Sequence, residues 1–312
     1  MPISFSQRVF SRFLNQISYV QHQEHQYLQL IKTILSCGVI QQGRNARTYS
    51  INGTMMRFPL VNKTLPLLTT KKMPWKTVSK ELIWFLKGNT STKWLTDRQV
   101  RIWDKNANTK EVQERNAKNG WLDDDLGPVY GHQWRHFNAP YEGYHKDYGG
   151  QGVDQLENII SALQDEDSGV RSSRRLIMSA WNPSQIHQMA LPPCHVLSHF
   201  LLRDDRHLDC IVYQRSGDVG LGVPFNIASY SALTHLIANH TDKEAGDFIY
   251  ILGNAHIYED HVEALKKQMN REPYPFPKIH VNKKNSVDDY DYHDMKIEKY
   301  VYHPKLDMNM TA

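Results

Sequence analysis

The segment from Met189 to Tyr230 constrains this chain more than any other part of the sequence. It opens with Met-Ala-Leu-Pro-Pro-Cys-His, so the thiol of Cys194 follows two prolines, whose fixed φ angles favour a rigid turn. It continues through the pair Arg215-Ser216 and a glycine-spaced stretch to Asn226. A nucleophile, a cation for an anionic group and an amide that can recognise a base therefore occur close together in one segment. This combination predicts a nucleotide site.

The composition is that of an ordinary globular protein. Of the 312 residues, 40% are hydrophobic and 22% are charged, and the net charge of +4 is too small to select a partner. Three cysteines, Cys37, Cys194 and Cys210, are too few for a secreted disulfide framework, which favours a reducing compartment such as the cytoplasm. No apolar run is long enough to suggest a membrane span.

The chain divides into a short extension and one large catalytic domain. Residues 1–20 place Arg8 and Arg12 among phenylalanines without an acidic residue, as in a mitochondrial targeting peptide or an arm packed on the domain. Residues 21–312 form the expected catalytic domain, with a polar insertion at about 107–125.

Hydrophobic periodicity predicts helices and strands in irregular alternation. Apolar residues at helical spacing predict helices over 21–37, 78–86, 153–163, 229–239 and 262–269, with Gly38 and Gly88 as stop signals. Apolar or alternating runs predict strands up to Phe58, over 176–181, 195–202, 208–213 and 246–253. We therefore expect an α+β fold, a three-layer α/β arrangement in which a large mixed or antiparallel sheet is flanked by helices.

Several charged residues have two interpretations at this stage. The polar stretch with Arg44 and Arg47 is either a loop that closes on a phosphate or a solvated surface loop. Arg174 and Arg175 are either solvent-exposed residues at a strand edge, which their residue type alone favours, or a pair that binds an anion. Glu81 lies inside an apolar helical pattern, so its carboxylate is either turned to solvent or buried with a function.

Motifs along the chain resemble those of the thymidylate synthase family. They are Leu191-Pro-Pro-Cys194-His, Tyr213-Gln-Arg215-Ser216-Gly-Asp218, Leu221-Gly-Val-Pro-Phe-Asn226, Arg174-Arg175, Glu81-Leu-Ile-Trp-Phe, Leu126-Gly-Pro-Val-Tyr130-Gly and His256-Ile-Tyr258. The resemblance runs in order from about His25 to the C-terminus, and Asn106 with the insertion resembles the eukaryotic-type monofunctional enzymes. It implies the fold of that family and a methyltransferase that converts dUMP to dTMP with 5,10-methylenetetrahydrofolate as cosubstrate, without a metal.

The resemblance also implies the catalytic roles. Cys194 adds to C6 of the uracil ring, which makes C5 able to attack a one-carbon electrophile. Arg215 lies beside this cysteine, and we expect it to lower the pKa of the thiol. Glu81 and Tyr130 resemble the proton-handling network, and Asn226 resembles the amide that recognises uracil at O4 and N3-H.

The binding residues follow from the same resemblance. Arg215, Ser216 and Arg44 hold the substrate phosphate, and Arg174 and Arg175 come from the second subunit of a homodimer. His256 and Tyr258 contact the ribose 3′-hydroxyl. For the folate, the implied residues are Asp218 at the pterin, Trp103, Asn106, Leu221, Gly222 and Phe225 along the slot, Lys71 at the glutamate tail and Ala312 in the closing C-terminus.

The chain departs from the family pattern at four places. The phosphate loop, Gly43 to Thr48, is one residue shorter than usual, which leaves either Arg44 or Arg47 as the phosphate ligand. His199 replaces a glutamine, Asn254 replaces an aspartate beside the ribose-binding histidine, and Ala312 replaces a terminal valine. The last change lies in the C-terminal segment that, by the resemblance, closes over the folate and excludes water.

Three alternative functions compete with this interpretation. A deoxyuridylate hydroxymethylase would share the fold and the nucleophile, but Trp103 and the Met-x-Met tail favour exclusion of water. A zinc site could use Cys194, His195, His199 and Cys210 as ligands, or His256 and His261. Two features argue against zinc: adjacent Cys-His side chains on a strand point to opposite faces, and the sequence has no CxxC pair. A nucleic-acid-binding module has no charge stripe or known motif to support it.

Overall fold

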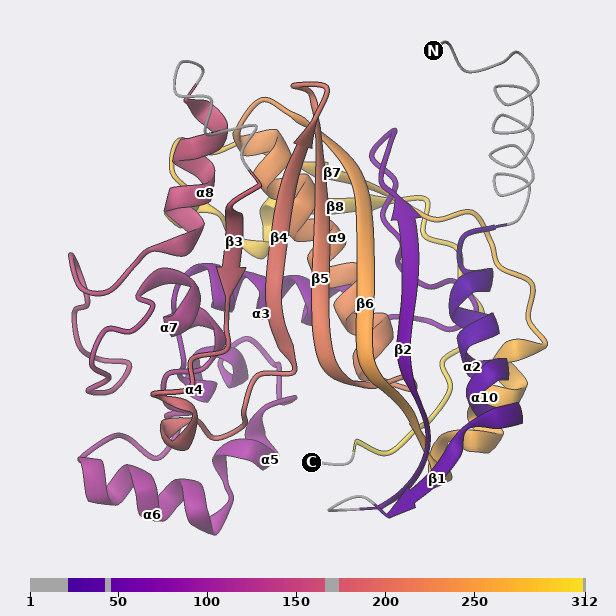
Figure 1. Ribbon diagram of the computed structural model, residues 1–312, viewed down its shortest axis with the longest axis horizontal. Helices are drawn as coiled ribbons and strands as arrows, with labels where there is room; N and C mark the ends of the chain where they lie inside the picture. The colour runs from indigo at the N-terminus through magenta and orange to yellow at the C-terminus, as the bar shows by residue number, and fades with distance from the viewer. Residues whose placement is uncertain (1–21, 43–45, 166–173, 311–312) are drawn as a thin grey trace, which may run out of the picture.

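The computed structural model describes residues 22–42, 46–165 and 174–310 (Figure 1). The predictions for the extension 1–20, for Arg44 and for Ala312 therefore lie outside the described residues. Within the described ranges, no helix has both the length and the hydropathy required to cross a bilayer.

A mixed six-stranded sheet forms the centre of the described chain (Figure 1). Its strands, in spatial order, are β1 (Val39–Gln42), β2 (Arg47–Pro59), β6 (Glu244–Tyr258), β5 (His207–Asp218), β4 (His195–Arg203) and β3 (Leu176–Ser179). All neighbouring pairs are antiparallel except β5 and β6, which are parallel and are connected through a long helix. The expected α+β class with a mixed sheet is confirmed.

The helices and a small second sheet surround this centre. The α-helices are α2 (His25–Cys37), α3 (Trp75–Leu86), α4 (Thr92–Thr96), α5 (Asp104–Ala107), α6 (Lys110–Asn119), α7 (Tyr130–Arg135), α8 (Gln155–Gln164), α9 (Gly222–His240) and α10 (Val262–Met269). Short 3-10 helices are η1 (Ile186–Gln188), η2 (Glu259–His261), η3 (Val287–Asp289) and η4 (Tyr292–Asp294), and β7 (Lys278–Val281) pairs with β8 (Met295–Glu298).

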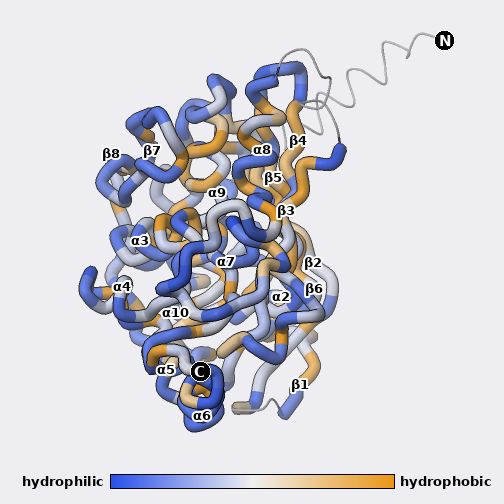
Figure 2. The backbone as a smooth tube through the Cα atoms, turned by 90° about the vertical axis from the view of Figure 1, so that its left-hand side faces the viewer, coloured by the Kyte–Doolittle hydropathy of each residue, from blue (hydrophilic) through white to orange (hydrophobic). Residues whose placement is uncertain are grey.

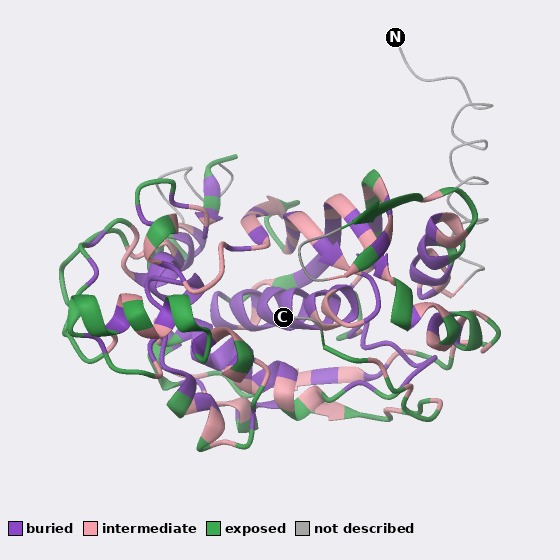
Figure 3. Ribbon diagram, turned by 90° about the horizontal axis from the view of Figure 1, so that it is seen from below, coloured by how far each residue is buried: buried purple, intermediate pink, exposed green. Residues whose placement is uncertain are grey.

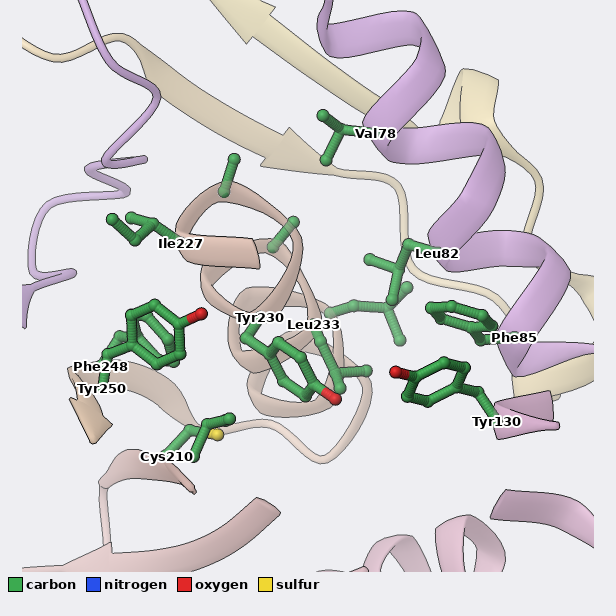
Figure 4. Packing of buried hydrophobic residues seen from close by; sticks show 14 of the residues in the cluster. Val78, Leu82, Phe85, Tyr130, Cys210, Ile227, Tyr230, Leu233, Phe248 and Tyr250 are labelled. Atoms are coloured by element: carbon green, nitrogen blue, oxygen red, sulfur yellow. The ribbon is translucent and has the colours of Figure 1, made fainter. Parts of the chain in front are cut away.

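Helix α9 is buried on almost every side and lies at the centre of the hydrophobic core. It is purple along nearly its whole length in Figure 3, and 16 of its 19 residues are buried. Figure 4 shows Ile227, Tyr230 and Leu233 of α9 among side chains of α3, α7, β5 and β6: Val78, Leu82, Phe85, Tyr130, Cys210, Phe248 and Tyr250. A helix that is enclosed on every side needs no polar stripe, so its sequence lacks a clear amphipathic period.

Two local predictions were wrong. Helix α9 begins at Gly222 rather than Ser229, because Pro224 lies in the first helical turn, where the missing N–H has no intrahelical partner to lose. Gly38 is extended (φ −67°, ψ 144°) rather than left-handed, and glycine is needed there because a Cβ would overlap the carbonyl oxygen of Ile34.

The polar insertion contains a capped helix. The Thr109 side chain accepts a hydrogen bond from Val112 N, and Gly120 ends α6 in the left-handed region (φ 70°). Figure 2 colours α6 largely blue, because most of its residues are polar or charged.

One face of the sheet is not covered by any helix of the described chain, and Figure 1 looks onto that face. A row of apolar side chains crosses it in register, with Met55 opposite Ile251, Ile251 beside Tyr213, and Tyr213 opposite Leu197. Met55 is 59% exposed and Tyr213 is 39% exposed. Side chains of this kind normally lie against a partner surface.

We predict that Leu233→Ala in α9 lowers the free energy of unfolding by about 2–5 kcal/mol, because it leaves a cavity in a fully buried site. The measurement is urea unfolding followed by circular dichroism. Leu122→Ala is the matched control, since Leu122 is 49% exposed and the same change should alter stability by no more than about 0.5 kcal/mol. Equal losses in both variants would contradict the central role of α9.

Candidate active site

The Cys194 turn lies at the start of β4, and Arg215 of β5 holds it in place. Arg215 N donates to Cys194 O at 2.9 Å, and the guanidinium donates from Nε to Pro193 O (2.8 Å) and from Nη2 to Pro192 O (2.9 Å). Arg215 Nη2 is also 3.8 Å from Cys194 Sγ. On the other side, Cys194 N donates to Tyr130 Oη at 2.7 Å. The predicted nucleophile is thus fixed through its backbone by two predicted site residues.

The expected effect of Arg215 on the thiol is only partly correct. Burial raises the pKa of Cys194, and the charge of Arg215 opposes this without reversing it. The net pKa is therefore raised, whereas we had expected a lowered value. In the ligand-free protein the thiol is held protonated, because the half-buried site disfavours a thiolate.

Glu81 and Trp103 form a buried pair next to Tyr130. Trp103 Nε1 donates to Glu81 Oε1 at 2.7 Å, and both side chains are buried. Burial raises the pKa of Glu81 to about 7, although the Trp103 hydrogen bond lowers it. The buried interpretation of Glu81 is correct, and a carboxyl group with this pKa can both give and take a proton at neutral pH.

His195 is a site residue that the sequence analysis considered only as a metal ligand. Its ring packs on Tyr130 with centroids 4.7 Å apart, and its Nδ1 is 3.2 Å from Tyr230 Oη. Burial lowers the pKa of His195 to about 3, and a side-chain hydrogen bond with Asn226 opposes that shift. His195 therefore stays neutral and holds the Asn226 amide, and its position directly after the nucleophile was the available signal.

A second cluster surrounds the turn that follows β5. Asp218 Oδ1 accepts from Gly220 N at 2.8 Å and is 3.6 Å from Nδ1 of His261. Glycine is required at position 220, because a Cβ there would overlap the His261 ring. Lys71 donates to Gly220 O, and burial lowers the pKa of Lys71 to about 8. Lys71 thus lies at this turn, and His261 is a contact that the sequence analysis did not assign to this site.

The remaining folate-side residues lie near these two clusters. Leu221, Gly222 and Phe225 belong to the start of α9, and Asn106 lies in α5 after Trp103. The last described residues are tied to the same region, since Lys105 Nζ donates to Met310 O (2.9 Å) and His261 Nε2 contacts Asn309 O (2.7 Å).

The strand register places four of the predicted site residues, Ser216, Asp218, His256 and Tyr258, on one face of the sheet. Ser216 lies beside Asn254, Asp218 lies beside His256, and Thr48 is opposite Tyr258. The His256 and Tyr258 rings meet edge to face, with centroids 5.3 Å apart. A nucleotide could therefore contact β5 and β6 together.

Arg47, Arg174 and Arg175 are not brought to Cys194 within one chain. Arg47 Nη1 pairs with Glu259 Oε1 at 3.3 Å, and both side chains are about half exposed. Arg174 and Arg175 are exposed ahead of β3, whose Leu176 pairs with Phe200 of β4. Cys194 precedes the opposite end of β4, about 20 Å away at ~3.3 Å per residue.

The four zinc candidates do not converge. His199 lies on the open face of the sheet between Ile177 and Ile211, whereas Cys210 is buried in the core beneath α9. Within the described ranges, no three His, Cys, Asp or Glu side chains are arranged to hold a metal ion.

Comparison with known proteins gives one family. A model of the family described as thymidylate synthase matches residues 25–312. Human thymidylate synthase is 47% identical over 293 residues, which cover 93% of this chain and 91% of the human protein. Thymidylate synthase 1/2 of Encephalitozoon cuniculi is 46% identical over 296 residues, which cover 94% of this chain and 98% of that protein.

Longer relatives match as well. The bifunctional dihydrofolate reductase-thymidylate synthase of Paramecium tetraurelia is 46% identical over 309 residues, or 98% of this chain. The match covers 65% of the Paramecium protein, and the chain spans about half of other bifunctional relatives. Because the family match covers the described site and most of the sequence, this chain belongs to the thymidylate synthase family.

Proposed function

We propose that this chain converts dUMP to dTMP, with 5,10-methylenetetrahydrofolate as cosubstrate and dihydrofolate as the second product. Family membership supports the reaction class. The geometric observation that carries the proposal is Cys194 held between Arg215 and Tyr130, close to a buried carboxyl group with a pKa of about 7.

The residues match the steps of the reaction. Cys194 Sγ loses its proton and forms a bond to C6, so that C5 gains the electrons needed to attack the one-carbon unit. Glu81 handles the protons that move to and from O4 and the folate nitrogen, and Asn226 recognises the uracil edge. The folate supplies the methylene group, C5 gives up its proton as the folate nitrogen leaves, and a hydride from the tetrahydrofolate then completes the methyl group. The Cys194 bond to C6 breaks in that last step, and its electron pair returns to the sulfur.

Arg215 also supports binding of the phosphate group. Its Nε and Nη2 are engaged with the Pro192 and Pro193 carbonyls, and its Cζ lies 5.5 Å from the centre of the Trp181 ring. A guanidinium held in this way keeps its charge and has donors left for a phosphate, because it carries five N–H groups. Ser216 follows it on β5 and adds a hydroxyl donor.

We also propose a homodimer formed through the open face of the sheet. The apolar row containing Ile251 and Tyr213 would be buried between two copies. Arg174 and Arg175 cannot reach Cys194 of their own chain. In a dimer they would contribute to the site around Cys194 of the second copy.

The product assay tests the proposed reaction. Incubation with dUMP and methylenetetrahydrofolate should yield dihydrofolate in step with dTMP, and Cys194→Ser should lower turnover roughly 10⁴-fold or more while dUMP still binds. Cys37→Ser is the control and should keep full turnover, because Cys37 is exposed on α2.

Three outcomes would count against this proposal. Hydroxymethyl-dUMP without dihydrofolate would identify a deoxyuridylate hydroxymethylase. Turnover by Cys194→Ser would exclude Cys194 as the nucleophile. Mass spectrometry with 5-fluoro-dUMP and the folate should detect a ternary adduct on Cys194, and absence of that adduct would also exclude Cys194 as the nucleophile.

We predict that Glu81→Gln lowers kcat by roughly 10²–10⁴-fold and removes the limb of the pH profile near pH 7. Glu111→Gln on the exposed face of α6 is the charge-matched control. The folded state keeps a proton on Glu81 between the ordinary pKa of 4.5 and about 7, whereas the unfolded chain releases it. Wild-type stability should therefore fall, relative to Glu81→Gln, as the pH rises through that window. A pH profile unchanged by the substitution would argue against Glu81.

Subunit complementation tests the shared site. Mixing inactive Cys194→Ser with inactive Arg174→Ala/Arg175→Ala should restore about a quarter of wild-type activity, since half of the randomly mixed dimers contain one intact site. Ile211→Arg on the open face should give monomers in analytical ultracentrifugation, whereas Leu122→Arg on the exposed surface should not. A lack of rescue between stable dimers would refute the shared site.

A further inference from the structure

Two asparagines on neighbouring strands form a hydrogen-bonded pair beside the nucleotide site. Asn52 of β2 is directly opposite Asn254 of β6, and Asn254 Nδ2 donates to Asn52 Oδ1 at 2.9 Å. Asn254 Oδ1 is 3.1 Å from Nδ1 of His256, two residues further along the same strand. The contacts therefore run from Asn52 through Asn254 to His256.

This chain of contacts fixes the hydrogen on the histidine ring. The Asn254 amide directs its NH2 group to Asn52, so its oxygen faces His256 and can only accept. Nδ1 of His256 must then be the donor, and in a neutral ring Nε2 is left as an acceptor. Asn52 matters because it fixes which end of the Asn254 amide faces the histidine.

The surroundings keep His256 neutral. Burial lowers the pKa of His256, Asp218 opposes this shift and His261 adds to it. Asp218 lies beside His256 on β5, Tyr258 meets its ring on β6, and His261 comes from η2. An aspartate at position 254 would add a carboxylate at hydrogen-bond distance and stabilise the charged ring.

We propose that Asn52 and Asn254 are a positioning pair that holds His256 in the tautomer with hydrogen on Nδ1. Nε2 then accepts a hydrogen bond from the free 3′-hydroxyl of a deoxynucleotide. This role rests on the proposed function for the identity of the ligand. The pair selects a hydroxyl donor at that position, and it disfavours a 3′-phosphate, which needs donors or positive charge from the protein.

The first test uses nuclear magnetic resonance of the full-length, ligand-free protein. Long-range proton–nitrogen spectra should show His256, identified by its loss in His256→Gln, with hydrogen on Nδ1. Asn52→Leu should release the Asn254 amide and give a mixture of tautomers. Asn52→Asp should keep the wild-type pattern, because a carboxylate still accepts from Asn254 Nδ2.

The second test measures charge and binding. Asn254→Asp should raise the titration midpoint of His256, whereas Asn158→Asp on the exposed face of α8 should leave it unchanged. Asn52→Leu should raise the KM for dUMP roughly fivefold with little change in kcat, since one hydrogen bond in the ground and transition states is weakened equally.

Each result bears on one conclusion. Hydrogen on Nε2 in the wild type, or an unchanged tautomer and KM in Asn52→Leu, would overturn the positioning role. Failure of the wild type to make dTMP would overturn the proposed function and would leave the ligand-free spectrum unaffected, so the two conclusions can fail separately.

Discussion

The hold of Arg215 on the Pro192–Cys194 turn is the interaction on which the site depends. Three hydrogen bonds connect one residue of a central strand to the carbonyls of three consecutive residues in the turn. The register of β4 against β5 shifts between His195 and Leu197, directly after the nucleophile, and such an irregularity lets the chain leave the ladder. The position of the thiol is therefore set by the sheet, and the same guanidinium has N–H donors left for an anionic group.

Burial shifts the pKa values of the acidic and basic groups next to Cys194 in opposite directions, because in each case it favours the neutral form. It raises the pKa of Glu81 to about 7, lowers that of His195 to about 3 and raises that of Cys194. Arg215 supplies a positive charge beside these groups, because a guanidinium is a cation at any physiological pH.

Sequence reasoning predicted the site residues that are unusual in their local pattern, and it missed features that depend on tertiary surroundings. Cys194, Arg215, Asn226 and Glu81 stand out because of their residue type in their local pattern. The start of α9 was missed because a helix enclosed on every side loses the amphipathic period, and Gly38 was misjudged because a close backbone contact explains it. His195 contacts Tyr230 of α9, and His261 of η2 lies against Asp218 of β5. These partners are far away in the sequence, and local patterns do not determine such tertiary contacts.

The amide at position 254 fits the charge distribution of the whole strand pair. Asp218 already lies beside His256, and Asn254 lies beside Ser216, where the substrate phosphate is expected. A carboxylate at position 254 would add a second negative charge beside His256, next to that of Asp218, and would favour the charged form of the histidine. An amide gives His256 the same acceptor without the charge, and it also supplies an N–H that a carboxylate lacks. That N–H needs its own partner, and Asn52 provides the acceptor from the neighbouring strand.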